Sequence, residues 1–441
     1  MNPFAFITSF GLVSMFMDIV YEGALAVQGP LLLSLGASAA LVGIISGLGE
    51  ATSLAGRLVS GPAADKSGKY WAFAIAGYAI TALAVPAMGF AGSVVAVSAL
   101  IIIERLGKSV RTPSRDAMLA HASSAVGRGK GFALHEALDQ VGAITGPLIV
   151  ATILSYTGEN YAPALGVLLI PGAIAIAILC VLRHKAPNPE LFEKKQDLQA
   201  QAKASNAAKK ASGVVRSGAE DQANPAEQLG AEDQSSAAEQ QATEEPTKYS
   251  SLPKTFWAYA AICGICLSGV ATFAIMSFHA VSVGVLSAAQ VPIVYAVAMA
   301  VDAVAALITG NLYDRIGPKT LLALPVISAL IPWFAYGETF AAIIAGAIIW
   351  GLATGVQEST MRAYVADLVP SNKRATAYGI FSLFTGVGTL LGGTIAGTLY
   401  ATLGAGAIIA WASIVQIIVF VVMIAVMKKP VVLKTANEQG E

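Results

Sequence analysis

Between two long apolar segments, the chain reads Gly61-Pro62-Ala63-Ala64-Asp65-Lys66-Ser67-Gly68-Lys69. At the same place in its second half it reads Gly310-Asn311-Leu312-Tyr313-Asp314-Arg315-Ile316-Gly317-Pro318-Lys319. Both stretches have a glycine, an aspartate four residues later, a basic residue directly after it and a second glycine. A polar turn that occurs twice inside apolar sequence predicts two halves of the same architecture.

The composition is that of a membrane protein. The chain has 441 residues, of which 56% are hydrophobic and 12% charged, whereas soluble domains carry about 25% charge. Twelve windows are long enough to span about 30 Å of hydrocarbon. They are 5–33, 39–60, 71–90, 94–116, 131–156, 163–183, 255–284, 289–311, 319–336, 340–366, 376–402 and 405–427. We therefore expect an all-α polytopic membrane protein, with twelve transmembrane helices in two pseudo-symmetric six-helix bundles.

The predicted domains are an N-terminal bundle at 1–185, a linker at 186–252, a C-terminal bundle at 253–430 and a tail at 431–441. The linker is rich in Ala, Gln, Glu, Lys and Ser, and no aromatic residue lies between Phe192 and Tyr249. Such a segment cannot bury a core, so we expect it to be disordered.

The lysines and arginines of the turns indicate the orientation. They gather at one side of the predicted bundle, at Lys66, Lys69, Arg128, Lys130, Arg183, Lys185, Arg315, Lys319, Lys373, Arg374, Lys428 and Lys429. The turns on the other side hold neither residue type. This asymmetry predicts a multi-pass protein of the plasma (bacterial inner) membrane, with both termini and the linker in the cytoplasm.

The repeat extends beyond the polar turn. Arg128-Gly129-Lys130-Gly131-Phe132 matches Arg374-Ala375-Thr376-Ala377-Tyr378, and the glycines of Gly142-x-x-x-Gly146-Pro147 match Gly388 and Gly392, both at an offset of 246 residues. Halves with equal helix numbers and equal orientation predict a pseudo-two-fold axis along the membrane normal.

These features resemble the major facilitator superfamily across the whole chain except the linker and the tail. The stretch Glu104-Arg105-Leu106-Gly107-Lys108-Ser109-Val110-Arg111-Thr112-Pro113-Ser114-Arg115-Asp116-Ala117 is similar to a prokaryotic permease group that carries R-x-G-K-x-x-R-x-x-x-R-D-A here. Membership implies alternating access by rocking of the two halves around a midplane site.

The Gly142, Gly146 and Pro147 stretch of the fifth predicted helix is a partial match to the antiporter signature of proton-coupled exporters. The fuller pattern has further glycines where this chain has Ala133, Val150 and Ala151. The resemblance therefore favours export modestly and assigns these three residues to helix packing.

The polar turns have two interpretations. As a conformational latch, their carboxylates would hold a helix N-terminus and their bases would pair with acids, while a topological anchor would only face lipid head groups. The predicted latch residues are Gly61, Asp65, Lys66, Gly68, Lys69, Gly310, Asp314, Arg315 and Gly317, with Arg111 and Arg115 pairing with Asp65 or Asp116 around them.

Carboxylates inside apolar windows mark candidate coupling or substrate sites. Asp18 and Glu22 are four residues apart and share a helix face. Glu50, Glu104 and Asp302 each lie within a span, where an ionised group costs at least about 2.5–3.5 kcal/mol. Such groups face the bundle interior, where they titrate or bind substrate, or else pair statically with a base such as Arg105.

Two further clusters are candidates for the same site. Arg105 and Lys108 could attract an anionic substrate from the fourth helix. His135, Glu136 and Asp139 of the fifth helix suit proton relay, hydrogen bonding between helices or, least well, a metal. Gln357 corresponds to Arg111 in the repeat and completes the list.

We therefore expect a secondary active transporter that uses protons to export a small organic solute or drug, as an antiporter. A symporter or exchanger of an anionic metabolite is the alternative, and a transporter-like membrane sensor is the alternative of another class. No phosphate-binding Gly-rich loop or nucleophile–base set is visible, so we expect no enzyme, cofactor or metal. The expected partners are a small-molecule substrate, protons and the lipid bilayer; we expect a monomer and, at a net charge of zero, no nucleic acid.

Overall fold

The computed structural model describes residues 1–124, 128–192, 252–370 and 373–427. Most of the predicted linker and the whole predicted tail lie outside these residues. The described stretch 186–192 packs on the first half of the molecule, where Trp71 Nε1 donates to the carbonyl of Pro187 and the Phe192 ring lies 5.4 Å from that of Phe6.

All regular elements of the described residues are helical. The first half consists of α1 (Pro3–Ser34), α2 (Ala39–Ala55), α3 (Arg57–Ser67), α4 (Tyr70–Phe90), α5 (Val94–Ser124), α6 (Arg128–Thr157), α7 (Tyr161–Gly166) and α8 (Leu169–Lys185). The second half consists of α10 (Lys254–Ser268), α11 (Phe273–Ser282), α12 (Val291–Ile316), the 3₁₀ helix η2 (Gly317–Leu322), α13 (Ala323–Ala335), α14 (Phe340–Leu368), α15 (Arg374–Leu403) and α16 (Ala405–Met427).

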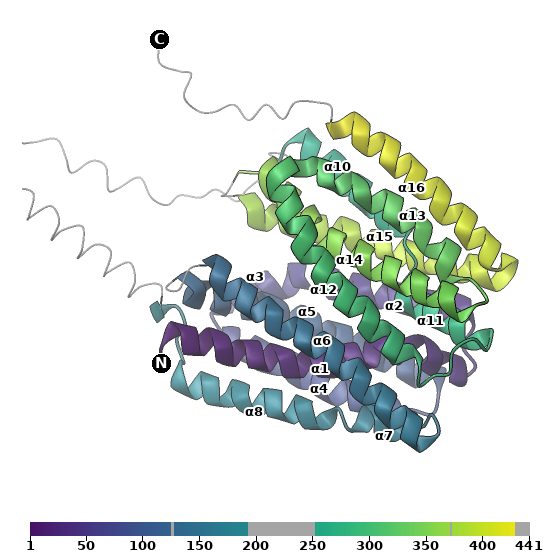
Figure 1. Ribbon diagram of the computed structural model, residues 1–441. Coiled ribbons are helices and arrows are strands. Elements are labelled where there is room, and N and C mark those ends of the chain that lie inside the picture. The colour runs from purple at the N-terminus through teal and green to yellow at the C-terminus, as the bar shows by residue number, and fades with distance from the viewer. Residues whose placement is uncertain (125–127, 193–251, 371–372, 428–441) are drawn as a thin grey trace, which may run out of the picture.

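The predicted fold class is confirmed: the two halves are separate bundles of helices that lie side by side (Figure 1). Within the described residues, ten helical stretches are long and apolar enough to cross a membrane. One of them, Val291–Ala335, covers most of two predicted windows, 289–311 and 319–336. The predicted window at 94–116 forms α5, which runs unbroken through Pro113 and carries the charged stretch of the sequence.

The two ends of the bundle differ in their turns. At the end that carries the basic turns, called here the basic end, Gly68 and Gly317 adopt φ of 64° and 68°, a conformation that suits glycine. At the opposite end, Ser38, Asn160 and Thr339 cap α2, α7 and α14 through their side chains. The turns at that end therefore have uncharged polar caps and hold no lysine or arginine.

Equivalent glycines build the two halves. A β-carbon at Gly142 or Gly146 of α6 would run into the backbone carbonyls of Met15 and Ile19 on α1. At Gly388 and Gly392 of α15 it would meet the carbonyls of Gly264 and Leu267 on α10 in the same way. The repeat read from the sequence is thus a repeat of helix packing.

One seam between the halves is a glycine contact of α2 with α15. Gly43 approaches the carbonyl of Gly393 so closely that no side chain would fit, and Gly397 approaches that of Ala39 in turn. Nearer the basic end, a β-carbon at Gly379 would meet the Leu58 side chain at 2.7 Å, so the seam continues along the molecule.

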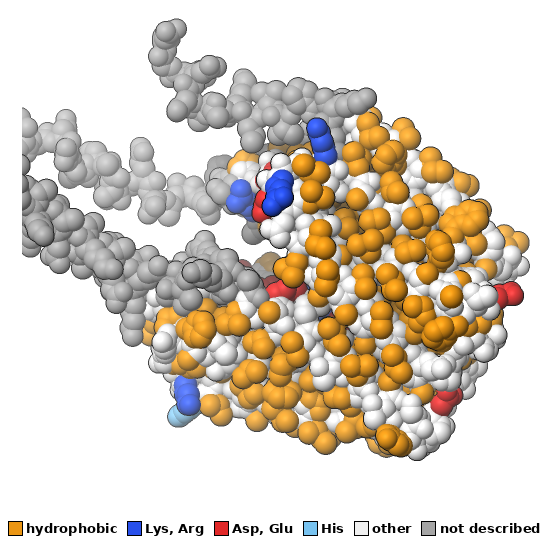
Figure 2. All heavy atoms as spheres, in the orientation of Figure 1, with side chains coloured by type: hydrophobic (Ala, Val, Ile, Leu, Met, Phe, Trp, Pro, Cys, Tyr) orange, Lys and Arg blue, Asp and Glu red, His pale blue; other side chains and the backbone are white. Residues whose placement is uncertain are grey.

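The opposite end is closed by further contacts between the halves. Ser46 of α2 and Thr272, which precedes α11, share a hydrogen bond of 2.9 Å, and Gly29 of α1 lies against the carbonyl of Ala274. At the basic end, Glu136 of α6 and Glu358 of α14 are exposed. Figure 2 shows hydrophobic side chains over most of the face in view, with acidic atoms in a recess between the halves near the basic end.

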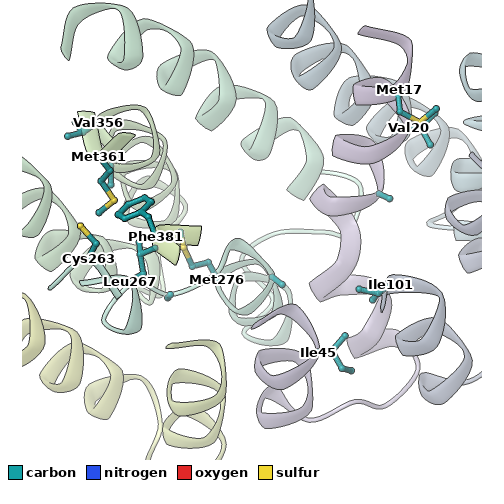
Figure 3. Packing of buried hydrophobic residues seen from close by; sticks show 14 of the residues in the cluster. Met17, Val20, Ile45, Ile101, Cys263, Leu267, Met276, Val356, Met361 and Phe381 are labelled. Atoms are coloured by element: carbon teal, nitrogen blue, oxygen red, sulfur yellow. The ribbon is translucent and has the colours of Figure 1, made fainter. Parts of the chain in front are cut away.

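The buried core is apolar in both halves. Figure 3 shows Cys263 and Leu267 of α10 beside Met361 of α14 and Phe381 of α15, with Ile45 and Ile101 in the other half. The two halves are therefore packed bodies, and the polar side chains described next are concentrated in and beside the first half.

Candidate functional site

Arg105 of α5 is the centre of a buried ion cluster. Its side chain is 1% exposed, and its Nη2 lies 3.0 Å from Glu50 Oε1 on α2. Its Nε lies 3.6 Å from Glu104 Oε2, and its Nη1 donates to the hydroxyl of Tyr21 on α1. Gly49 provides the space for the Arg105 side chain, because a β-carbon there would lie 3.2 Å from Arg105 Cγ.

The ring of Tyr21 holds a second cation. Arg105 Cζ lies 4.6 Å from the ring centroid, and Lys108 Nζ lies 3.7 Å from it. Both distances are within the range of a cation–π contact. Lys108 is half-buried and within the electrostatic reach of Glu50, Glu22 and Asp18, so it points to the acids of α1.

Glu22 joins the two halves. The Tyr295 hydroxyl of α12 donates to Glu22 Oε2 across 2.6 Å. Asp18, one turn before Glu22, is half-buried and is acted on by the charges of Lys108 and of Glu136 on α6. Neither carboxylate faces lipid, in agreement with the expectation that they face the bundle interior.

His135 and Asp139 form a chain of polar contacts through the first half. His135 Nδ1 lies 3.4 Å from Asp139 Oδ2, and its Nε2 shares a hydrogen bond of 2.7 Å with Ser14 Oγ on α1. Ser14 Oγ in turn lies 3.4 Å from the hydroxyl of Tyr78 on α4. This arrangement connects three helices and can pass a proton between its members.

The two outer arginines of α5 have different partners. Arg115 Nε pairs with Asp116 at 2.9 Å, as expected, and its Nη1 lies 3.9 Å from Asp139 Oδ2. Arg111 differs from the expected pairing with Asp65 or Asp116: it donates to Thr81 Oγ1 at 2.7 Å and stacks on the Tyr78 ring. Gly77 explains this, since its missing side chain lets α4 approach Arg111 closely.

Asp302 of α12 is the predicted site acid of the second half. Its side chain is 3% exposed, and its Oδ1 has no hydrogen-bond partner among the described residues. The Gln140 side chain of α6 faces this carboxyl across the seam between α6 and α12. The charges of Glu358 and Glu22 also act on it, so acids of both halves form one cluster.

The two polar turns are exposed at the basic end. Asp65 accepts a hydrogen bond of 3.0 Å from Tyr70, within the same half. Within the described part of the chain, no ion pair joins Asp65, Lys66 or Lys69 to the second half. A β-carbon at Gly61 would lie 3.7 Å from Pro113 Cβ on α5, whereas Gly310 has open space beside it. Asp314 and Arg315 are exposed.

The remaining predicted residues take supporting positions. Pro147 is buried in α6 next to Gly146, where the helix packs on α1. Gln357 is half-buried on α14, next to exposed Glu358. The sequence did not single out Glu358 as a site residue, although its charge acts with those of Glu136 and Asp18 across the gap between the halves.

A metal fits this site poorly. Ligand atoms of His135, Glu136 and Asp139 all lie within 4.8 Å of one another. However, one histidine nitrogen is bonded to Ser14, and the Arg115 guanidinium 3.9 Å from Asp139 would repel a cation. Shared protons suit these groups better than a coordinated ion.

Several residues that contact the candidate site residues were not predicted from the sequence. Tyr21, Tyr295, Ser14, Tyr78 and Thr81 all contact the ionisable residues directly. The only signal for them was a hydroxyl inside an apolar helix, because a buried hydroxyl needs a hydrogen-bond partner. That signal cannot say which partner it is.

Comparison with known proteins agrees with this architecture. The model of the Major Facilitator Superfamily matches residues 5–285 and 261–441. An uncharacterised protein of Mycobacterium tuberculosis is 44% identical over 97% of this chain and 94% of its own length. An uncharacterised MFS-type transporter of Methanocaldococcus jannaschii is 22% identical over 88% of this chain and 87% of its own.

Solved structures show the same fold. The crystal structure of a point mutant of the nucleoside transporter NupG superposes with a TM-score of 0.67 at 15% identity, over 96% of this chain and 99% of that one. An identity this low carries the fold and says nothing of the solute. With the family model matched along both halves, the chain belongs to the major facilitator superfamily and is a multi-pass secondary transporter.

Proposed function

We propose that this protein is a proton-coupled transporter that exports a small organic solute by alternating access. The observation that carries the proposal is the hydrogen bond between Glu22 and Tyr295, because it joins a carboxylate of one half to a hydroxyl of the other. A group that gains or loses charge at this position acts directly on the contact between the halves.

The coupling follows from the chemistry of that bond. An ionised Glu22 accepts a short, charge-assisted hydrogen bond, which is about twice as strong as a neutral one. Protonation of Glu22 removes the charge, weakens the bond to Tyr295 and lowers the cost of separating the halves there. A proton bound at Glu22 therefore favours opening of the end that is closed in this structure.

The neighbouring polar groups support proton movement to this point. His135, Asp139 and Glu136 lie on α6, nearer the basic end, and Asp18 lies between them and Glu22. The exposed Glu136 and Glu358 give the cluster an opening to solvent at the basic end. Protons could thus exchange between water and Glu22 along carboxylates and a histidine.

The alternative of an anionic solute has less support from the geometry. Arg105, on which that alternative depended, is paired with Glu50 and Glu104 and hydrogen-bonded to Tyr21. An occupied guanidinium has no free face for a carboxylate or phosphate. Lys108 is the remaining candidate, and carboxylates lie near it.

We further propose that the basic end faces the cytoplasm. Lysine and arginine are enriched in cytoplasmic turns, and the turns of the opposite end hold neither. In this orientation the recess is open to the cytoplasm, which is the side from which an exporter takes its solute. The partial antiporter signature at Gly142, Gly146 and Pro147 favours the same direction.

Proteoliposomes containing a pH-sensitive dye test the coupling. A panel of cationic, neutral and anionic organic solutes is added across an imposed pH gradient, and solute flux and internal pH are read together. We expect the wild-type protein to move at least one solute in the direction opposite to that of the protons. Solute flux that leaves the internal pH unchanged would contradict it.

Two variants locate the coupling. Glu22→Gln keeps the acceptor of the hydrogen bond but cannot titrate, so it should lose solute-driven proton movement and keep its folded state. Glu159→Gln changes an exposed acid in the turn after α6 and should behave as wild type. Full coupling in Glu22→Gln would remove this residue from the mechanism.

A further inference from the structure

The second half faces Glu22 with a group of three aromatic rings, called here the aromatic wall: Phe273 of α11, Tyr295 of α12 and Trp350 of α14. The ring centroids of Phe273 and Tyr295 lie 4.6 Å apart, those of Phe273 and Trp350 5.4 Å, and those of Tyr295 and Trp350 6.1 Å. Since Tyr295 also donates to Glu22, the wall and the carboxylate belong to one site.

Trp350 gives this wall an accessible surface. Phe273 and Tyr295 are 5% and 1% exposed, whereas Trp350 is half-buried. Glu358 lies eight residues along α14 from Trp350, about 80° around the helix axis, and it is exposed. Because Glu358 interacts with Glu136 and Asp18 of the other half, this side of α14 faces the site.

The charges around the wall are mostly negative. Carboxyl groups of both halves act on one another there: Asp18, Glu22, Glu136, Asp302 and Glu358. Of the bases nearby, Arg105 is paired, Arg111 and Arg115 have partners on α4 and α5, and Lys108 lies over the Tyr21 ring. Arg57 of α3 and Arg362 of α14 also act on this cluster, close to Glu50 and Glu358, but the carboxyl groups still outnumber the bases without a partner. A positively charged solute would compensate this excess.

An unsatisfied group points in the same direction. Asp302 Oδ1 is buried without a hydrogen-bond partner among the described residues, and the side chain is 3% exposed. Buried carboxylate oxygens normally have a donor. A cationic or N–H-bearing solute in the site would bring one.

We propose that the transported solute is an organic cation with an apolar body, bound by the Glu22 carboxylate and by the accessible ring of Trp350, which packs on Tyr295. This proposal rests on the proposed transport function and names its substrate class. Aromatic faces attract ammonium and related cations, most strongly when water is excluded. The apolar body would lie toward Phe273, behind which a small apolar pocket is lined by Val291, Val294 and Ala347.

Other ligand classes fit less well. A metal ion prefers oxygen, nitrogen or sulfur ligands and gains nothing from an aromatic wall. An organic anion would approach more carboxylates than bases, since Arg57 and Arg362 already lie close to Glu50 and Glu358. A neutral apolar solute would use the wall but not the charge.

Equilibrium binding to the purified full-length protein tests the class without any gradient. The probes are tetraphenylphosphonium and tetraphenylborate, which have nearly the same shape and opposite charge, so detergent partitioning is controlled. We expect saturable binding of tetraphenylphosphonium and none of tetraphenylborate above that seen with empty micelles. Equal binding of the two ions, or saturable binding of the anion alone, would overturn the proposal.

Variants place the bound cation. Trp350→Ala and Glu22→Gln should each weaken tetraphenylphosphonium binding by about tenfold, the size expected for one desolvated cation–π or ionic contact. Trp350→Phe keeps a ring face and should lose clearly less, which also shows that the fold tolerates substitution there. Trp333→Ala, at a tryptophan 61% exposed on α13, is the matched control and should bind as wild type. Unchanged affinity in both Trp350→Ala and Glu22→Gln would contradict the assignment.

The two proposals can fail separately. If tetraphenylphosphonium does not bind while another solute drives protons in proteoliposomes, the substrate class is wrong and the coupling stands. If tetraphenylphosphonium binds as described but its transport moves no protons, the site is right and the coupling is wrong.

Discussion

Arg105 has 1% of its side-chain surface exposed and contacts two carboxylates and a tyrosine hydroxyl. A buried charge is tolerated only when its partners replace the lost water. Glu50, Glu104 and Tyr21 do this from three helices, α2, α5 and α1. The cluster therefore fixes the relative positions of these helices inside the first half.

Removing the guanidinium should destabilise the protein. Arg105→Gln leaves the buried Glu104 and the half-buried Glu50 without their base, and breaking a buried pair typically costs about 3–5 kcal/mol. We expect a clear drop in the melting temperature of the purified protein, with a smaller drop for Arg105→Lys, which keeps the charge but not the fork of donors.

The matched control is Lys69→Gln, which changes an exposed base at the basic end and should melt as wild type. If Arg105→Gln melted at the wild-type temperature, the cluster would not be structural. Arg105 would then be available for a solute, and the anionic alternative would regain its basis.

At this scale, the sequence predicted which residues carry charge inside the bundle but not with whom they pair. A carboxylate within a span must face the interior, because the free-energy cost of exposing it to lipid is high. Whether such a carboxylate forms a static ion pair or takes part in proton coupling can be decided only from the folded structure. Glu50 and Glu104 turn out to be paired with Arg105, while Glu22 meets a tyrosine of the other half that no local pattern pointed to.

The seam between α2 and α15 is the most extensive contact between elements of different halves in the described part of the chain. Gly43 and Gly393 meet backbone to backbone, with Gly47 and Gly397 on either side. Small residues let helices approach closely in lipid, where packing replaces the hydrophobic effect as the driving force. The seam between α6 and α12, by contrast, brings together Gln140 and Asp302, which are larger and polar.

A methyl group in the glycine seam should open the closed end. Gly393→Ala places a β-carbon against the carbonyl of Gly43, and overpacking of this kind costs about 1–3 kcal/mol. A Ser46→Cys thiol, 6% exposed in the parent, should then react about tenfold faster with a membrane-impermeant maleimide. The background for the assay carries Cys180→Ser, Cys263→Ala and Cys266→Ala.

Gly406→Ala is the control for this substitution, since a β-carbon there has no neighbour within 4 Å. The same assay reports on orientation. The reagent should act when it is added outside intact cells; reaction only in inverted vesicles would place the opposite end in the cytoplasm. An unchanged rate in Gly393→Ala would show that this seam does not control closure.

The glycine pairs also show how much of the helix packing can be predicted from the sequence. Gly142 and Gly146 were expected to pack a helix, and they do so on α1. Gly43 and Gly47, like Gly393 and Gly397, have the same spacing of four residues. That spacing predicts a close neighbour but not its identity, because helices far apart in the chain meet only in the folded bundle.

Across the whole molecule, the duplicated turn led to the right architecture. Two halves with the same number of spans leave few arrangements in a bilayer, since every backbone polar group must be bonded within a helix. The sequence could not say which end is closed. That depends on contacts between halves, such as Ser46 with Thr272, which differ between the states of a transporter.

The central claim is that protonation of the acids between the halves changes the relative orientation of the two halves. Distances between spin labels test it: one pair at Lys69 and Lys319 on the basic end, the other at Glu159 and Glu338 on the opposite end, all exposed. On acidification we predict that the opposite-end distance grows while the basic-end distance shrinks, and that Glu22→Gln holds the acidic distances at every pH. Two distances that stay constant over the whole pH range, in the wild type and in Glu22→Gln alike, would contradict the account.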